Sequence, residues 1–77
     1  MATQKIWSLQ YVAGNPLMFS KVTTAAGSPM KRSEALEGAK TIESNGGGWR
    51  AWVQHAESGV RIFESAPEKQ YQASLLA

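Results

Sequence analysis

The segment from Trp49 to Ser65 constrains the fold most strongly, because its side chains alternate with the period of two that a β-strand requires. One side of its first strand carries Trp49, Ala51, Val53 and His55. The other side carries Arg50, Trp52 and Gln54. Residues 56–59, AESG, have the composition of a turn, and residues 60–65 return as a second strand. The segment therefore predicts an antiparallel hairpin.

The turn decides the register of this hairpin. A turn centred on residues 57–58 makes two apolar cross-strand pairs, Val53 with Ile62 and Trp52 with Phe63. It also sets Gln54 beside Arg61. A tighter turn at residues 58–59 would break both apolar pairs, so we expect the first register.

The first 24 residues predict a second hairpin. Residues 5–13, KIWSLQYVA, alternate in the same way. Because Ser8 and Gln10 lie on one side, we expect the core on the other side, which carries Trp7, Leu9 and Tyr11. Gly14-Asn15-Pro16 supplies turn chemistry, and residues 17–24 are rich in aromatic and β-branched side chains.

A helix is expected between the two hairpins. Ser28 with Pro29 and Ser33 with Glu34 both match helix starts, and we favour an ordered turn at the first pair and a regular helix from Ser33. Its narrow apolar stripe consists of Ala35, Ala39 and Ile42, with Leu36 at the margin. The helix is expected to end at Asn45-Gly46.

A second, short helix is expected at the C-terminus. Residues 65–68, SAPE, match a capping box, in which Ser65 reaches forward and Glu68 reaches back. Tyr71 and Leu75 lie one turn apart and are expected to hold this helix on the body. The order ββαββα predicts a two-layer α+β fold, a four-stranded antiparallel sheet with one main helix on one face. A length of 77 residues indicates a single small domain, residues 1–77.

The three glycines at residues 46–48 do not match a phosphate-binding loop. Such a loop follows a strand and opens a helix, whereas here a helix precedes and a strand follows. We interpret the glycines as a helix stop and a connector. In the strand that follows, Trp49 is expected to lean toward the core, while the exposure of Trp52 decides whether it can contact a partner.

The chain offers little for catalysis. It contains no cysteine and no aspartate, and His55 is its single histidine, which excludes a Ser-His-Asp triad and a thiolate nucleophile. A metal site would have to combine His55 with glutamates such as Glu57 or Glu64, in no recognised spacing. We therefore expect a protein that is not an enzyme and that binds no metal and no cofactor.

Composition also bears on location and assembly. No apolar run approaches the ~20 residues that span a bilayer, and no signal-like stretch opens the chain, so we expect a cytoplasmic protein without membrane contact. A core of this size supplies little net stability. Without cysteine, a disulfide is excluded, which leaves tight packing or a homodimer.

The expected binding surface is the second side of the 49–65 hairpin, which carries Arg50, Trp52, Gln54, Arg61 and Phe63. Its aliphatic side would then be the core, with Ala51, Val53, Val60 and Ile62. Burying Trp52 and Phe63 instead could stabilise the fold by several kcal/mol. The two arginines on the same side favour exposure, because unpaired charges are costly to bury.

The leading hypothesis for function is a non-catalytic protein-interaction module, inhibitor or adaptor that binds a protein through this surface. Its size suits an accessory protein of a phage or mobile element. The alternative is a nucleic-acid-binding module that stacks single-stranded bases on Trp52 and Phe63. Its phosphate contacts would come from Arg50, Lys21, Lys31 and Arg32. The first 33 residues hold four cations and no acidic residue, which is compatible with either partner.

Overall fold

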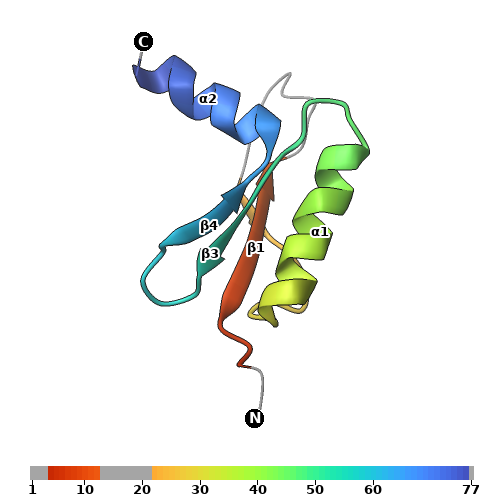
Figure 1. The fold of residues 1–77 in the computed structure, drawn as a ribbon, viewed down its shortest axis with the longest axis vertical. Helices are drawn as coiled ribbons and strands as arrows, with labels where there is room; N and C mark the ends of the chain where they lie inside the picture. Colours follow the sequence, from red (N-terminus) through yellow and green to blue (C-terminus); the bar gives the residue numbers. More distant parts are fainter. Residues whose placement is uncertain (1–3, 13–21, 77) are drawn as a thin grey trace.

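The structure is a computed structural model that describes residues 4–12 and 22–76. Its elements are β1 (Trp7–Val12), β2 (Thr23–Thr24), α1 (Arg32–Ser44), β3 (Arg50–His55), β4 (Arg61–Glu64) and α2 (Ala66–Leu76). The predicted ββαββα order and the α+β class are confirmed (Figure 1). The turn predicted at residues 14–16 and the strand predicted at residues 17–21 lie outside the described residues.

The four strands form one antiparallel sheet in the order β2-β1-β3-β4. The two hairpins therefore meet through β1 and β3, which pair from Trp7 opposite His55 to Val12 opposite Arg50. β2 is short and sets Thr23 opposite Tyr11. Within the described residues, the predicted strand 17–24 is confirmed only for its last two positions.

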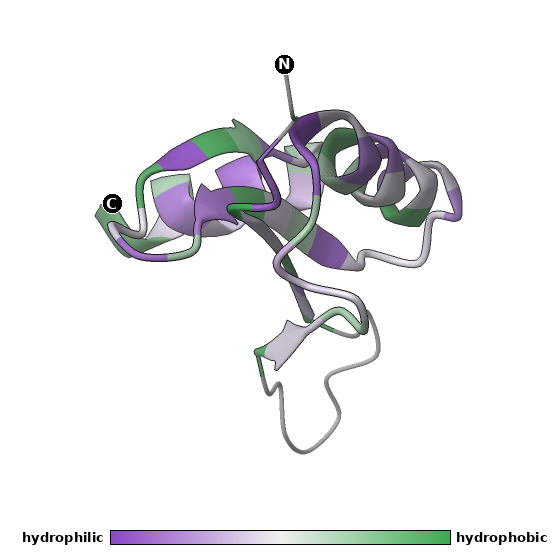
Figure 2. Cartoon of the chain, turned by 90° about the horizontal axis from the view of Figure 1, so that it is seen from below, coloured by the Kyte–Doolittle hydropathy of each residue, from purple (hydrophilic) through white to green (hydrophobic). Residues whose placement is uncertain are grey.

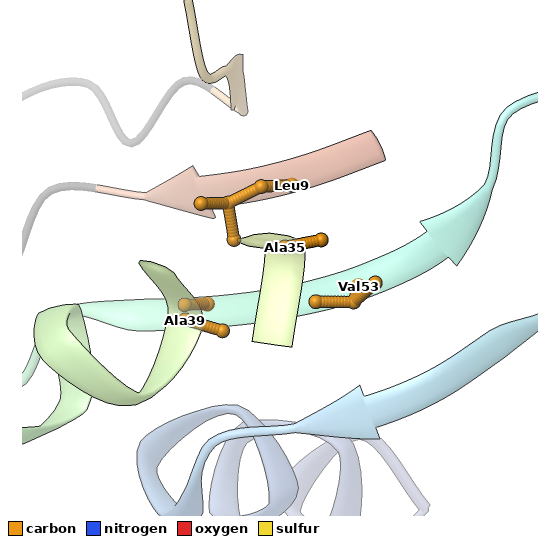
Figure 3. Close-up of a cluster of buried hydrophobic side chains, with 5 residues drawn as sticks. Leu9, Ala35, Ala39 and Val53 are labelled. Carbon is orange, nitrogen blue, oxygen red and sulfur yellow. The ribbon is translucent and has the colours of Figure 1, made fainter. Parts of the chain in front are cut away.

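The core lies between α1 and one face of the sheet (Figure 1). It consists of Leu9, Ala35, Ala39, Ala51 and Val53, all buried. Figure 3 shows Leu9 and Val53 from the strands meeting Ala35 and Ala39 from α1. Small residues bring the helix close to β1, since a Cβ added at Gly38 would lie 2.7 Å from Cδ2 of Leu9. The predicted apolar stripe of the helix is confirmed.

Both ends of α1 follow from local hydrogen bonding and backbone freedom. At its start, the N–H of Lys31 donates to the carboxylate of Glu34 at 3.3 Å. At its end, Asn45 is the cap residue, and Gly46 adopts a φ of +74° that a residue with a Cβ rarely takes. The predicted stop at residues 45–46 is confirmed, and the three glycines join a helix to a strand.

The predicted register of the β3–β4 hairpin is wrong. The observed pairs are Trp52 with Glu64, Val53 with Phe63, and Gln54 with Arg61. The last pair agrees with the prediction, but the register shifts between Val53 and Gln54, where Ile62 is an extra residue on β4. This bulge carries Phe63 to the α1 side of the sheet, beside Val53.

α2 begins one residue after β4, at a turn held by Ser65. The hydroxyl oxygen of Ser65 accepts the N–H of Ala51 at 3.0 Å and that of Glu68 at 3.4 Å. Glu43 of α1 accepts the N–H of Ala66 at 2.6 Å. The forward half of the predicted capping box is therefore confirmed. Neither described helix has the length and apolar character to cross a bilayer.

Candidate functional site

The predicted exposure of Trp52 is wrong, because its side chain is only 5% exposed. It lies on the side of the sheet opposite α1, where the guanidinium of Arg61 covers its ring at 4.3 Å from the centroid. Its Nε1 donates to Oε1 of Gln54 at 2.9 Å. The arginines that favoured exposure instead help to bury the tryptophan.

A carboxylate from α2 offsets the free-energy cost of holding two arginines close to this buried side of the sheet. Oε1 of Glu68 accepts a hydrogen bond from Nη1 of Arg50 at 3.1 Å, and Oε2 accepts one from Nη1 of Arg61 at 2.7 Å. Oε2 also accepts the amide of Gln72 at 2.8 Å. Glu68 is fully buried, whereas both arginines keep some exposure. We call Arg50, Arg61 and Glu68 the ion triad.

The charges of the ion triad and its neighbours balance. Burial acts to lower the pKa of Arg61, but the carboxylates of Glu68 and Glu64 act against it, and the pKa lies above its ordinary value. Glu64 pairs with the same guanidinium at 2.7 Å. The guanidinium of Arg50 lies 3.7 Å from the ring centroid of Tyr71. No cation of this group is left free for a phosphate.

Part of the predicted binding surface therefore comes together, but its two arginines are already paired with Glu68 of the same chain. Four of its residues come together around Glu68, namely Arg50, Trp52, Gln54 and Arg61. Phe63 lies on the other side of the sheet. Sequence reasoning missed Glu68, which it assigned to the capping box. The sequence signal that could have identified it is a pair of arginines on one side of a hairpin, followed by a glutamate in the first turn of the next helix.

Trp49 is more exposed than its predicted lean toward the core implies. It precedes β3, is 39% exposed, and stacks on Tyr11 with ring centroids 5.9 Å apart and planes at 16°. The exposures of the two tryptophans are thus reversed relative to expectation, because Trp52 is covered by the guanidinium of Arg61, which Glu68 of α2 holds in place.

α2 has an inverted burial pattern, since it buries its glutamate and exposes its large apolar side chains. Tyr71 is 42%, Leu75 61% and Leu76 89% exposed. Figure 2 shows hydrophobic colouring at the end of α2, beside the C-terminus. The prediction that Tyr71 and Leu75 hold the helix on the body is wrong for Leu75, which is exposed, whereas Tyr71 contacts the sheet through Arg50 of β3. Glu68, in the first turn, is the buried anchor of the helix.

The exposed apolar side chains of α2 lie along its length, from the ring that Arg50 contacts to the last turn. We call Tyr71, Leu75 and Leu76 the α2-end surface. Trp49 is not part of it, because Trp49 stacks on Tyr11, which packs against the core on the α1 side of the sheet. Among the described residues, three further large apolar side chains are exposed, Val22, Trp49 and Val60. Val60 lies at the opposite end, because its carbonyl accepts the N–H of His55.

The predicted phosphate contacts do not form one site with Arg50. Lys31 follows Met30, which bridges to Trp7 at the start of β1, and Arg32 is next to it. Arg50 pairs with the last residue of β1, about 15–20 Å away along six residues. Lys21 lies outside the described residues.

His55 serves a structural purpose. Its Nδ1 accepts the N–H groups of Glu57 at 3.1 Å and Ser58 at 3.3 Å, and its ring meets Trp7 edge-on at 5.5 Å. Over residues 4–12 and 22–76, no three potential metal ligands come together. A hollow of about 590 Å³ lies along α1, and its described lining residues all belong to that helix.

No protein-family model, no curated protein and no solved structure matches this chain.

Proposed function

We propose that this chain is a non-catalytic protein-binding module whose contact surface is the α2-end surface. The observation that carries the proposal is the inverted burial of α2, with Glu68 inside and Leu75 and Leu76 outside. An amphipathic helix that served only the stability of its own domain would bury its leucines. Exposed aromatic and leucine side chains grouped on one part of a small protein are typical of a surface that meets another protein.

The ion triad supports the proposal by fixing the orientation of α2. Glu68 ties the first turn to two strands at once, through Arg50 on β3 and Arg61 on β4. Glu43 adds a contact from α1 to the start of the helix. A helix held by its first turn presents its last turns in a defined direction, which lowers the entropy that a partner must remove on binding.

A protein partner fits these observations better than a nucleic acid. Base stacking needs exposed rings, but Trp52 is buried and Phe63 faces the opposite side. The candidate phosphate contacts at Lys31 and Arg32 stand at the far end of β1 from Arg50. We place the activity in the cytoplasm, in keeping with the absence of cysteine.

Site-specific photo-crosslinking in cells that naturally contain the chain tests this proposal. A photoreactive residue replaces Leu75 in one variant and Val60 in another, two positions that are equally exposed at 61%. The α2-end surface predicts protein adducts at position 75 and background at position 60. Equal yields at both positions, or none at either, would contradict the proposal.

A further inference from the structure

We infer that the partner of the α2-end surface is a second copy of this chain, so that two copies associate through this end in a two-fold dimer. This inference rests on the proposed function and names its partner. A two-fold contact joins the same patch of both copies, and the patch must therefore be compatible with itself in shape, polarity and charge.

The exposed apolar area of the α2-end surface is close to what a dimer contact needs. With side-chain areas of roughly 150–250 Å², the exposed fractions of its three residues amount to about 350 Å² of surface per copy. A standard interface removes about 800 Å² from each partner, and about 60% of it is apolar. The apolar share of one partner is therefore about 480 Å². The α2-end surface supplies about three-quarters of that share with side chains that are already exposed.

The α2-end surface carries no net charge of its own. Near it, the charge of Arg50 is neutralised by Glu68, and residues 70–76 contain no charged side chain. Two such surfaces meet without bringing like net charges together. The other end of β1 differs, because Lys31 and Arg32 stand close together there. Self-association is therefore favoured at the α2 end.

The position of α2 leaves it accessible to a second copy of the chain. Figure 1 shows α2 extending beyond the ends of β3 and β4, away from α1. A projecting helix can lie antiparallel to its symmetry mate while the two sheets stay apart. Tyr71 and Leu75 are four residues apart and share one side of the helix, which gives the contact an apolar stripe. Burial of this stripe would give α2 apolar contacts that the ion triad does not provide.

Sedimentation equilibrium over a wide range of chain concentrations tests the inference. The wild-type chain is expected to rise from the monomer mass of 8.4 kDa to twice that value. Leu75→Glu is expected to weaken self-association by about tenfold or more, because it places a charge in the contact. Val60→Glu is the matched control, with the same exposure at the opposite end, and is expected to leave it unchanged. Far-UV circular dichroism verifies that both variants fold, and Leu76→Ser is a second variant at the contact.

Three results would overturn the inference: a monomer at every concentration, a dimer insensitive to both contact variants, or a dimer broken by Val60→Glu. The crosslinking experiment separates this failure from failure of the proposed function. Adducts at position 75 with a different protein, together with a monomeric chain, would support the binding surface but exclude a second copy as its partner. Adducts at neither position would exclude both the binding surface and the dimer.

Discussion

The buried carboxylate of Glu68 offers the sharpest test of how α2 is held. Glu68→Gln keeps the size of the side chain and removes its charge. The change leaves Arg50 and Arg61 facing an amide that can accept hydrogen bonds from them but cannot neutralise either charge. Because Glu68 is fully buried, solvent at position 68 does not compensate for the loss of its charge.

The structure sets the size of the effect. Removing one partner from a fully buried ion pair costs about 3–5 kcal/mol. The side chains of Arg50 and Arg61 keep exposures of 16% and 31%, and water recovers part of that cost. We therefore expect a loss of about 2 kcal/mol. For a chain of this length the total free energy of unfolding is about 4–12 kcal/mol, so the variant still folds.

Urea denaturation followed by far-UV circular dichroism measures the loss. With a slope of about 1 kcal/mol per molar urea, the midpoint falls by about 2 M. The matched control is Glu64→Gln, which removes a carboxylate from the same Arg61 in a half-exposed pair at 2.7 Å. That control is expected to cost below about 0.5 kcal/mol. Equal costs for the two variants would refute the reasoning that burial makes Glu68 the anchor.

Substitutions at three further positions test contacts elsewhere by the same assay. Ser65→Ala should cost about 2 kcal/mol, because it leaves the buried N–H of Ala51 without its acceptor, and a cost near zero would contradict that contact. Gly38→Ala should cost about 1 kcal/mol despite the higher helix propensity of alanine, since the new Cβ meets Leu9 at 2.7 Å, whereas a gain in stability would show that Leu9 can move aside. His55→Ala should cost about 1 kcal/mol and His55→Asn less, because asparagine also offers an acceptor to the turn; equal costs would exclude that role.

Local patterns predict the elements of this fold well. The period of two in residues 5–13 and 49–55 predicts the central strands, and the spacing of Ala35 and Ala39 predicts which side of α1 is buried. These signals are reliable because each lies within one element. The stop at residues 45–46 is equally local, because it depends on the backbone freedom of glycine.

The candidate site is less predictable, because it depends on contacts between elements. An extra residue at Ile62 turns Phe63 to the other side, and alternation contains no signal for such an insertion. The burial of Trp52 depends on Arg61, whose charge is balanced by Glu68 from a different element. A pattern that assigns polar residues to the outside therefore reverses the roles of Trp49 and Trp52.

The most direct test of the α2-end surface is electron paramagnetic resonance of a spin label beside it. The chain has no cysteine, so Ser74→Cys on α2 and Ser58→Cys in the β3–β4 turn each give one labelling site. Association through the α2-end surface predicts that the label at position 74 becomes less mobile and shows dipolar coupling as concentration rises, while the label at position 58 stays mobile. Equal mobility at both positions and no coupling at any concentration would contradict it.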